Sequence, residues 1–66
     1  MNTYKVGYNI TEDEGQTQFL AVFTVNADTQ REAIWQAGEL VDGAFLISEY
    51  TFDHEYPTTI EKVGNQ

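Results

Sequence analysis

An excess of negative charge is the feature that most limits how this chain can fold. Eleven Asp and Glu residues stand against three Lys and Arg in 66 residues, which gives a net charge of -8 at pH 7. Repulsion between like charges favours solubility and opposes compaction, and a domain of this length has only a small core to offset it. The acidic side chains therefore either lie apart on a solvated surface or form a surface that binds a basic partner.

Because the chain has no cysteine, packing alone must hold the fold together. No disulfide can form, and His54 is the single His or Cys side chain that a structural zinc ion could use. An apolar content of 41% and an aromatic content of 14% argue against a disordered chain. We therefore expect one folded domain over residues 1–66, with no metal and no cofactor.

The N-terminal residues and the hydropathy pattern indicate a cytoplasmic protein. Residues 1–5 lack the charged segment, followed by an apolar one, that is typical of a signal peptide. No apolar run approaches the ~20 residues of a membrane span. The absence of cysteine is compatible with a reducing compartment. We expect no membrane partner.

Two segments in the first half of the chain have the period-two pattern of β-strands. Residues 3–10 carry an apolar side chain at every even position, from Tyr4 to Ile10. Residues 18–27 are apolar on both faces, because Leu20 and Val22 lie opposite the face of Phe19, Phe23 and Val25. The polar residues 11–16 join the two segments, so the sequence predicts a β-hairpin.

A helix is predicted next, from Gln30 to Asp42. Thr29 and Glu32 form a capping box, in which the Thr hydroxyl accepts from the N3 amide. Gly43 suits the left-handed residue that often ends a helix. Apolar residues then recur at helical spacing and form one stripe. They are Ala33, Ile34, Ala37, Leu40 and Val41.

The remaining residues complete an α+β fold. Residues 44–56 read as a long third strand that ends before Pro57, and residues 58–63 are compatible with a short fourth strand. The order β-β-α-β predicts one helix packed on a three-stranded antiparallel or mixed sheet. With the third strand beside the first, the sheet order is 2-1-3 and the helix covers one face.

The opposite face of that sheet is the first candidate for self-association. Leu20 and Val22 point to it, and an exposed apolar patch often marks an interface. Two interpretations are open: this face forms a homodimer or partner contact, or the C-terminal segment folds over it.

The predicted third strand carries a row of acidic residues. Glu49, Asp53 and Glu55 share one face by parity, and same-face neighbours lie ~6.6 Å apart along a strand. Such a row imitates the phosphates of a nucleic acid toward a basic groove, as a DNA mimic does. The alternative is the wet side of an ordinary half-buried strand.

Further candidates for a partner contact are an acidic turn and three aromatic side chains. Glu12, Asp13 and Glu14 lack the ligand spacing of a calcium loop, so this turn is either solvated or part of an acidic interface. Trp35 lies at the margin of the helix's apolar stripe, where it is either the rim of the core or a binding hot spot. The two other candidate apolar anchors are Tyr50 and Tyr56.

The residues that catalysis requires are missing from the sequence. There is no Cys, Ser48 is the only Ser, and parity places His54 on the opposite face from Asp53 and Glu55. There is no glycine-rich phosphate loop. The acidity argues against direct binding of nucleic acid, which requires Lys and Arg to neutralise phosphates. We therefore expect a protein-binding protein and not an enzyme.

Two stretches resemble a known family. Residues 25–29, Val-Asn-Ala-Asp-Thr, with Glu32-Ala33, resemble the strand-to-helix junction of small coliphage-encoded inhibitors of bacterial RNA polymerase. Residues 43–45, Gly-Ala-Phe, with Ile47, resemble their return into the last strand. The resemblance covers about half of the chain. It implies a compact phage protein, for host takeover or counter-defence, that blocks a host machine by binding it.

Charge, size and resemblance together favour an inhibitor from a phage or mobile element. Its acidic strand and turn would occupy a basic, nucleic-acid-binding surface of a host RNA polymerase, nuclease or defence complex, in the cytoplasm of a bacterial host. Carboxylates would supply steering and some specificity. The alternative function is an assembly protein that self-associates through the open sheet face, where Leu20 and Val22 would matter most.

Overall fold

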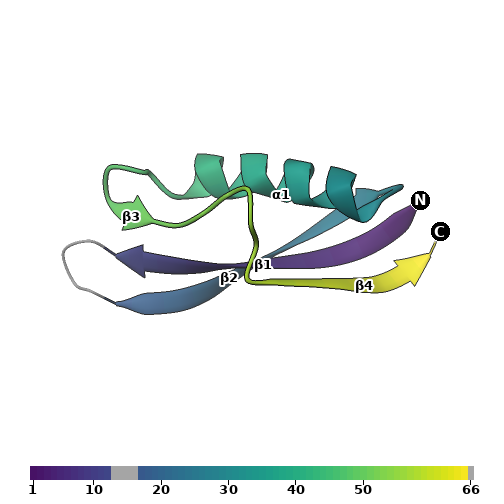
Figure 1. The fold of residues 1–66 in the computed structure, drawn as a ribbon, viewed down its shortest axis with the longest axis horizontal. Coiled ribbons are helices and arrows are strands. Elements are labelled where there is room, and N and C mark those ends of the chain that lie inside the picture. Colours follow the sequence, from purple (N-terminus) through teal and green to yellow (C-terminus); the bar gives the residue numbers. More distant parts are fainter. Residues whose placement is uncertain (13–16, 66) are drawn as a thin grey trace.

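One helix lies across an antiparallel sheet in the computed structural model, which describes residues 1–12 and 17–65 (Figure 1). This arrangement confirms the α+β class and the β-β-α-β order with a fourth strand. The elements in chain order are β1 (Asn2–Glu12), β2 (Gln18–Ala27), α1 (Gln30–Ala44), β3 (Tyr50–Thr51) and β4 (Thr59–Asn65).

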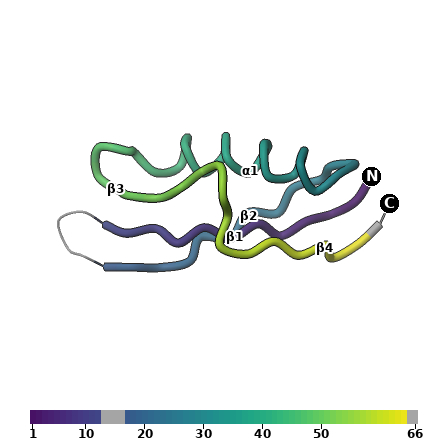
Figure 2. Tube along the Cα trace, in the orientation of Figure 1, coloured from purple at the N-terminus to yellow at the C-terminus, as the bar shows by residue number. Residues whose placement is uncertain are grey.

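Strand β1 is the centre of the sheet. On one side it pairs with β2 along residues 2–11, from Asn2 opposite Ala27 to Thr11 opposite Gln18. On its other side β4 pairs with residues 2–7 and β3 with residues 11–12, so two short strands share one edge. The tube in Figure 2 shows the chain descending from the level of the helix to the sheet between β3 and β4. The path β2-β1-β3 matches the predicted order.

The core lies between α1 and the helix-facing side of β1. Every even position of β1 from Tyr4 to Ile10 is buried, as the period-two pattern predicts. The helix contributes Ala33, Ala37 and Val41, which have no exposed surface. Small alanine side chains let the helix approach the sheet closely, so the large aromatic and branched residues of β1 fill the space beneath it.

The helix begins where the capping box predicts and ends later than predicted. The Glu32 N–H donates to the Thr29 hydroxyl at 3.1 Å, which satisfies one of the free amides of the first turn. At the other end the helix continues through Gly43 to Ala44, and Phe45 follows in extended conformation. The predicted cap at Gly43 is therefore wrong.

The predicted third strand over residues 44–56 is also wrong, because only Tyr50–Thr51 form a strand there. Near the start of this stretch, local hydrogen bonds take the place of a sheet ladder. The amides of Glu49 and Tyr50 both donate to the Leu46 carbonyl at 2.9 Å, which closes a turn directly after the helix.

The C-terminal segment joins the sheet and leaves its outer face uncovered. β4 lies in the plane of the sheet beside β1, and Asn65 pairs with Asn2 at one end of the molecule (Figure 1). Leu20 and Val22 are consequently 48% and 52% exposed. The sequence left open whether the C-terminal segment folds over this face. For the described residues it does not, because β4 pairs with the edge of β1.

Candidate protein-binding surface

The segment between β3 and β4 passes directly over the helix at Gly38. A Cβ atom built on Gly38 would stand 2.9 Å from the backbone oxygen of His54, closer than such atoms approach in proteins. Gly38 is buried, and its missing side chain is what allows the segment to contact the helix. This contact defines one wall of a groove.

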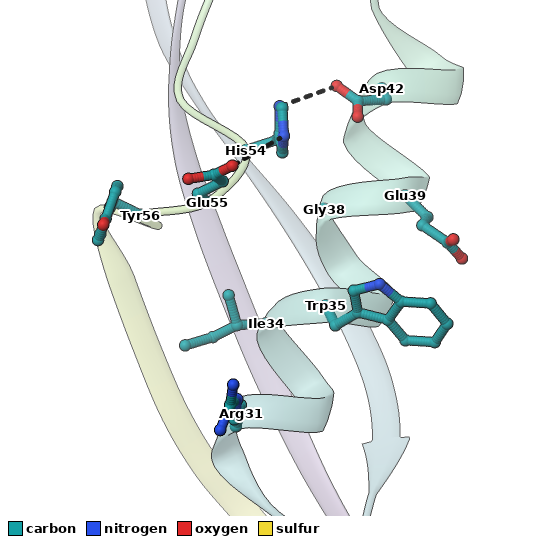
Figure 3. Close-up of a pocket in the computed structure, with 9 residues that line it drawn as sticks. All are labelled: Arg31, Ile34, Trp35, Gly38, Glu39, Asp42, His54, Glu55 and Tyr56. Atoms are coloured by element: carbon teal, nitrogen blue, oxygen red, sulfur yellow. Dashed lines mark ion pairs between the residues drawn. The ribbon is translucent and has the colours of Figure 1, made fainter.

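Polar contacts hold the same segment in place. His54 Nδ1 lies 3.5 Å from Asp42 Oδ1 on the helix, and its Nε2 lies 3.9 Å from Glu55 Oε1 (Figure 3). The Glu55 N–H donates to the Asp53 carboxylate at 3.0 Å, which is a side-chain turn typical of Asp. His54 thus lies between one carboxylate of the helix and one of its own segment.

A groove of about 690 Å³ lies between α1 and residues 54–56. We call it the acidic groove. Figure 3 shows Ile34 pointing from the helix toward the side on which Tyr56 lies, whereas Trp35 and Glu39 project from the opposite flank and form the outer rim. The residues that line the acidic groove are Arg31, Ile34, Trp35, Gly38, Glu39, Asp42, His54, Glu55 and Tyr56.

The acidic groove combines exposed aromatic rings with an excess of carboxylates. Trp35 is 65% exposed and Tyr56 is 74% exposed, values far from those of core aromatic residues. Glu39, Asp42 and Glu55 supply three carboxylates against the single guanidinium of Arg31. Lys and Arg side chains have the matching chemistry, because their stems pack on aromatic rings and their cationic ends meet carboxylates.

The helix beneath the groove is fixed to the sheet through Tyr8. The Tyr8 hydroxyl donates to the Ile34 backbone oxygen at 3.4 Å. Burial raises the pKa of Tyr8 above its usual value, and the negative charge of Asp42 raises it further. The phenol therefore stays neutral at ordinary pH and remains a hydrogen-bond donor.

The structure brings together three of the partner-binding residues that the sequence predicts: Trp35, Glu55 and Tyr56. Glu49 and Asp53 do not line the acidic groove. Since residues 44–56 do not form one strand, the predicted row of carboxylates on a single strand face is wrong. Glu49 lies in the turn after the helix, and Asp53 lies in the segment after β3.

Two other predicted residues, Glu12 and Tyr50, lie at the far end of the molecule. Tyr50 is half-buried in an aromatic cluster, with its ring 5.1 Å from that of Phe45 and 6.4 Å from that of Phe19, so it belongs to the packing of the hairpin end. Glu12 pairs with Tyr50 in the sheet. Asp13 and Glu14 lie outside the described residues.

Several groove residues were not among the predicted site residues. Arg31, Glu39 and Asp42 lie three or four residues from Trp35 or from one another, so helical spacing alone places them on one face of α1. What the sequence did not indicate is that His54 and Glu55 approach this face from another segment.

The acidic groove presents carboxylates, one guanidinium, one imidazole and two aromatic rings as contact groups for a partner. None of its lining residues is a Ser, Thr or Cys nucleophile. Within residues 1–12 and 17–65, no three His, Cys, Asp or Glu side chains are arranged to hold a metal ion. In the same part of the chain, no helix is long and apolar enough to cross a membrane.

Comparison with known proteins gives no relative from which a role could be transferred. Protein-family models, curated proteins and solved structures all yield no match to this chain.

Proposed function

We propose that this protein is a non-enzymatic binding module that engages a basic surface of another protein through the acidic groove. The observation that supports this proposal most strongly is the exposure of Trp35 and Tyr56 beside three carboxylates. Aromatic residues of this kind are typical anchors of protein interfaces. The net charge of -8 adds long-range attraction for a basic partner and repels acidic ones.

The more specific form of the proposal is an inhibitor from a phage or mobile element, acting in the cytoplasm of a bacterial host. It would bind a surface on which the host protein normally holds nucleic acid. The support for this form is the resemblance to inhibitors of RNA polymerase around residues 25–33, together with the acidity of the groove. The carboxylates would then compete with phosphates for the same Lys and Arg side chains.

The proposal is tested by capture of partners on an immobilised variant with a neutralised groove. Glu39 and Glu55 are replaced together by Gln, which removes two charges and changes little in shape. The matched control replaces Glu32 and Glu61 by Gln, which removes the same charge outside the groove. Mass spectrometry identifies proteins that the wild type and the control retain at low salt and lose at high salt.

The groove variant should lose those partners, and the control should keep them. Equal retention by both variants would contradict the proposal, because net charge rather than the groove would then explain binding. Replacing Tyr56 by Ala separates the aromatic contribution, since this change leaves the charge unaltered. Neutralising Glu49, which lies outside the groove, should have little effect on capture.

Self-association is a second candidate function, favoured by the exposure of Leu20 and Val22 on the open sheet face. A protein that assembles through this face would use its charge only for solubility. Replacing Leu20 by Glu should then dissociate the assembly, whereas the groove proposal predicts no change in oligomeric state. High salt weakens binding to a basic partner but leaves an apolar face intact.

A further inference from the structure

The two edges of the sheet differ in how they are protected against pairing with another strand. The edge away from β2 is formed by β3 and β4. β3 has only two residues. β4 carries the charged residues Glu61 and Lys62, and its pairing with β1 shifts register between Thr3 and Tyr4. Short length, charge and irregularity are the devices that prevent edge-to-edge association. The outer edge of β2 has none of them.

Strand β2 is long, uncharged and unpaired on its outer side. It runs for ten residues with no proline and no charged side chain, and no described strand pairs with its outer edge. Residues 15–27 form the longest run without a charged residue in this acidic chain. We call the outer side of β2 the free edge.

The hydrogen bonds of β1 show which residues of β2 face the free edge. Gly7 accepts from the Thr58 amide and Asn9 donates to the Thr58 hydroxyl, so the odd residues of β1 point away from β2. Their partners in β2 are the even residues, whose N–H and C=O groups therefore point outward. These are Gln18, Leu20, Val22, Thr24 and Asn26.

Apolar side chains flank the free edge on both faces of the sheet. Leu20 and Val22 lie on the open face, and Phe19 is 37% exposed on the helix face. Leu40 is 48% exposed and lies about 200° around the helix from Gly38, on the flank opposite the acidic groove. A strand added here would gain backbone hydrogen bonds and cover apolar surface at the same time.

We propose that the free edge of β2 pairs antiparallel with β2 of a second copy of this chain, which joins two sheets into one. Centring the two-fold axis at Val22 places Leu20 opposite Thr24 of the other copy. Every outward N–H then meets an outward C=O, because the set of outward residues is symmetric about Val22.

The absence of carboxylates makes this edge the place where a second copy can approach most easily. Two chains of net charge -8 repel, and the repulsion is weakest where neither presents a carboxylate, as along β2. A basic partner is drawn instead to the carboxylates of the acidic groove. This dimer leaves the acidic groove free and does not depend on the function proposed for it.

The test compares Thr24→Pro with Thr24→Ala by sedimentation equilibrium across a concentration series. Proline removes one outward N–H and leaves the pairing with β1 intact, and edge strands tolerate it. The wild type and Thr24→Ala should dimerise alike, and Thr24→Pro should raise the dissociation constant by about 10- to 100-fold. The dimer should tighten as salt rises, opposite to binding through the groove.

Amide hydrogen exchange of the wild type decides the matter even where the proline variant fails to fold. In the dimer, amides of both even and odd residues of β2 are protected. Protection confined to the odd residues, or a wild type that stays monomeric, overturns the proposal. The proposal is also overturned if Leu20→Glu dissociates the dimer and Thr24→Pro leaves it intact. That pattern indicates that the open sheet faces stack on one another. If the even amides become protected only after another protein is added, then that protein, and not a second copy of this chain, pairs with the free edge.

Discussion

Replacing Gly38 by Ala should destabilise the protein although Ala is the better helix former. In a helix interior this change is worth about 1 kcal/mol in favour of folding. At Gly38, however, the new Cβ would stand 2.9 Å from the His54 backbone oxygen, and a backbone atom cannot rotate aside. Overpacking of this kind costs about 1–3 kcal/mol, so the expected net loss lies between about 0 and 2 kcal/mol.

Gly43 in the same helix provides the matched control. A Cβ on Gly43 meets no atom within 4 Å, so Gly43→Ala should gain about 0.5–1 kcal/mol. Urea unfolding followed by circular dichroism measures both variants, whose free energies of unfolding should differ by about 0.5–3 kcal/mol. That difference corresponds to at least ~2 °C in Tm for a domain of this size. If Gly38→Ala and Gly43→Ala stabilise the protein equally, the contact between α1 and the segment that joins β3 to β4 is refuted.

Two further predictions concern stability. Burial and Asp42 raise the pKa of Tyr8, so the folded state keeps this proton to higher pH than the unfolded state does. The free energy of unfolding should therefore fall as pH rises above about 10. In urea titrations at alkaline pH, Tyr8→Phe should make the free energy of unfolding depend less on pH. Thr29→Ala should lower the free energy of unfolding by about 1 kcal/mol through loss of the Glu32 amide bond, whereas Thr29→Ser should not.

Patterns that depend on near neighbours predicted the first two thirds of the fold. The alternation in residues 3–10 predicts β1, and the capping box predicts the start of the helix at Gln30. Each of these signals acts within one element. A side chain such as Val6 needs only a period of two, and Thr29 needs only the amide three residues later.

The region after the helix could not be predicted in this way. Residues 50–56 alternate as a strand does, yet the Asp53 carboxylate accepts the Glu55 amide, and the chain turns out of the sheet. The local signals point both ways, because the alternation favours a strand and the Asp53 side chain favours a turn. The contact between Gly38 and His54 is decisive, and it joins residues far apart in sequence. The acidic groove depends on that contact, so the sequence predicted Trp35, Glu55 and Tyr56 as site residues but not that they line one groove.

The central position of β1 has a consequence for how the chain folds. β1 pairs on one edge with β2, which follows it closely in the sequence. On its other edge β1 pairs with β4, which lies near the C-terminal end of the described chain. The hairpin and helix form local contacts and can appear early, whereas the β1–β4 ladder closes a long loop and is expected late. A product truncated before Thr59 would expose the long side of β1, and aggregation rather than proteolysis alone would then limit its yield.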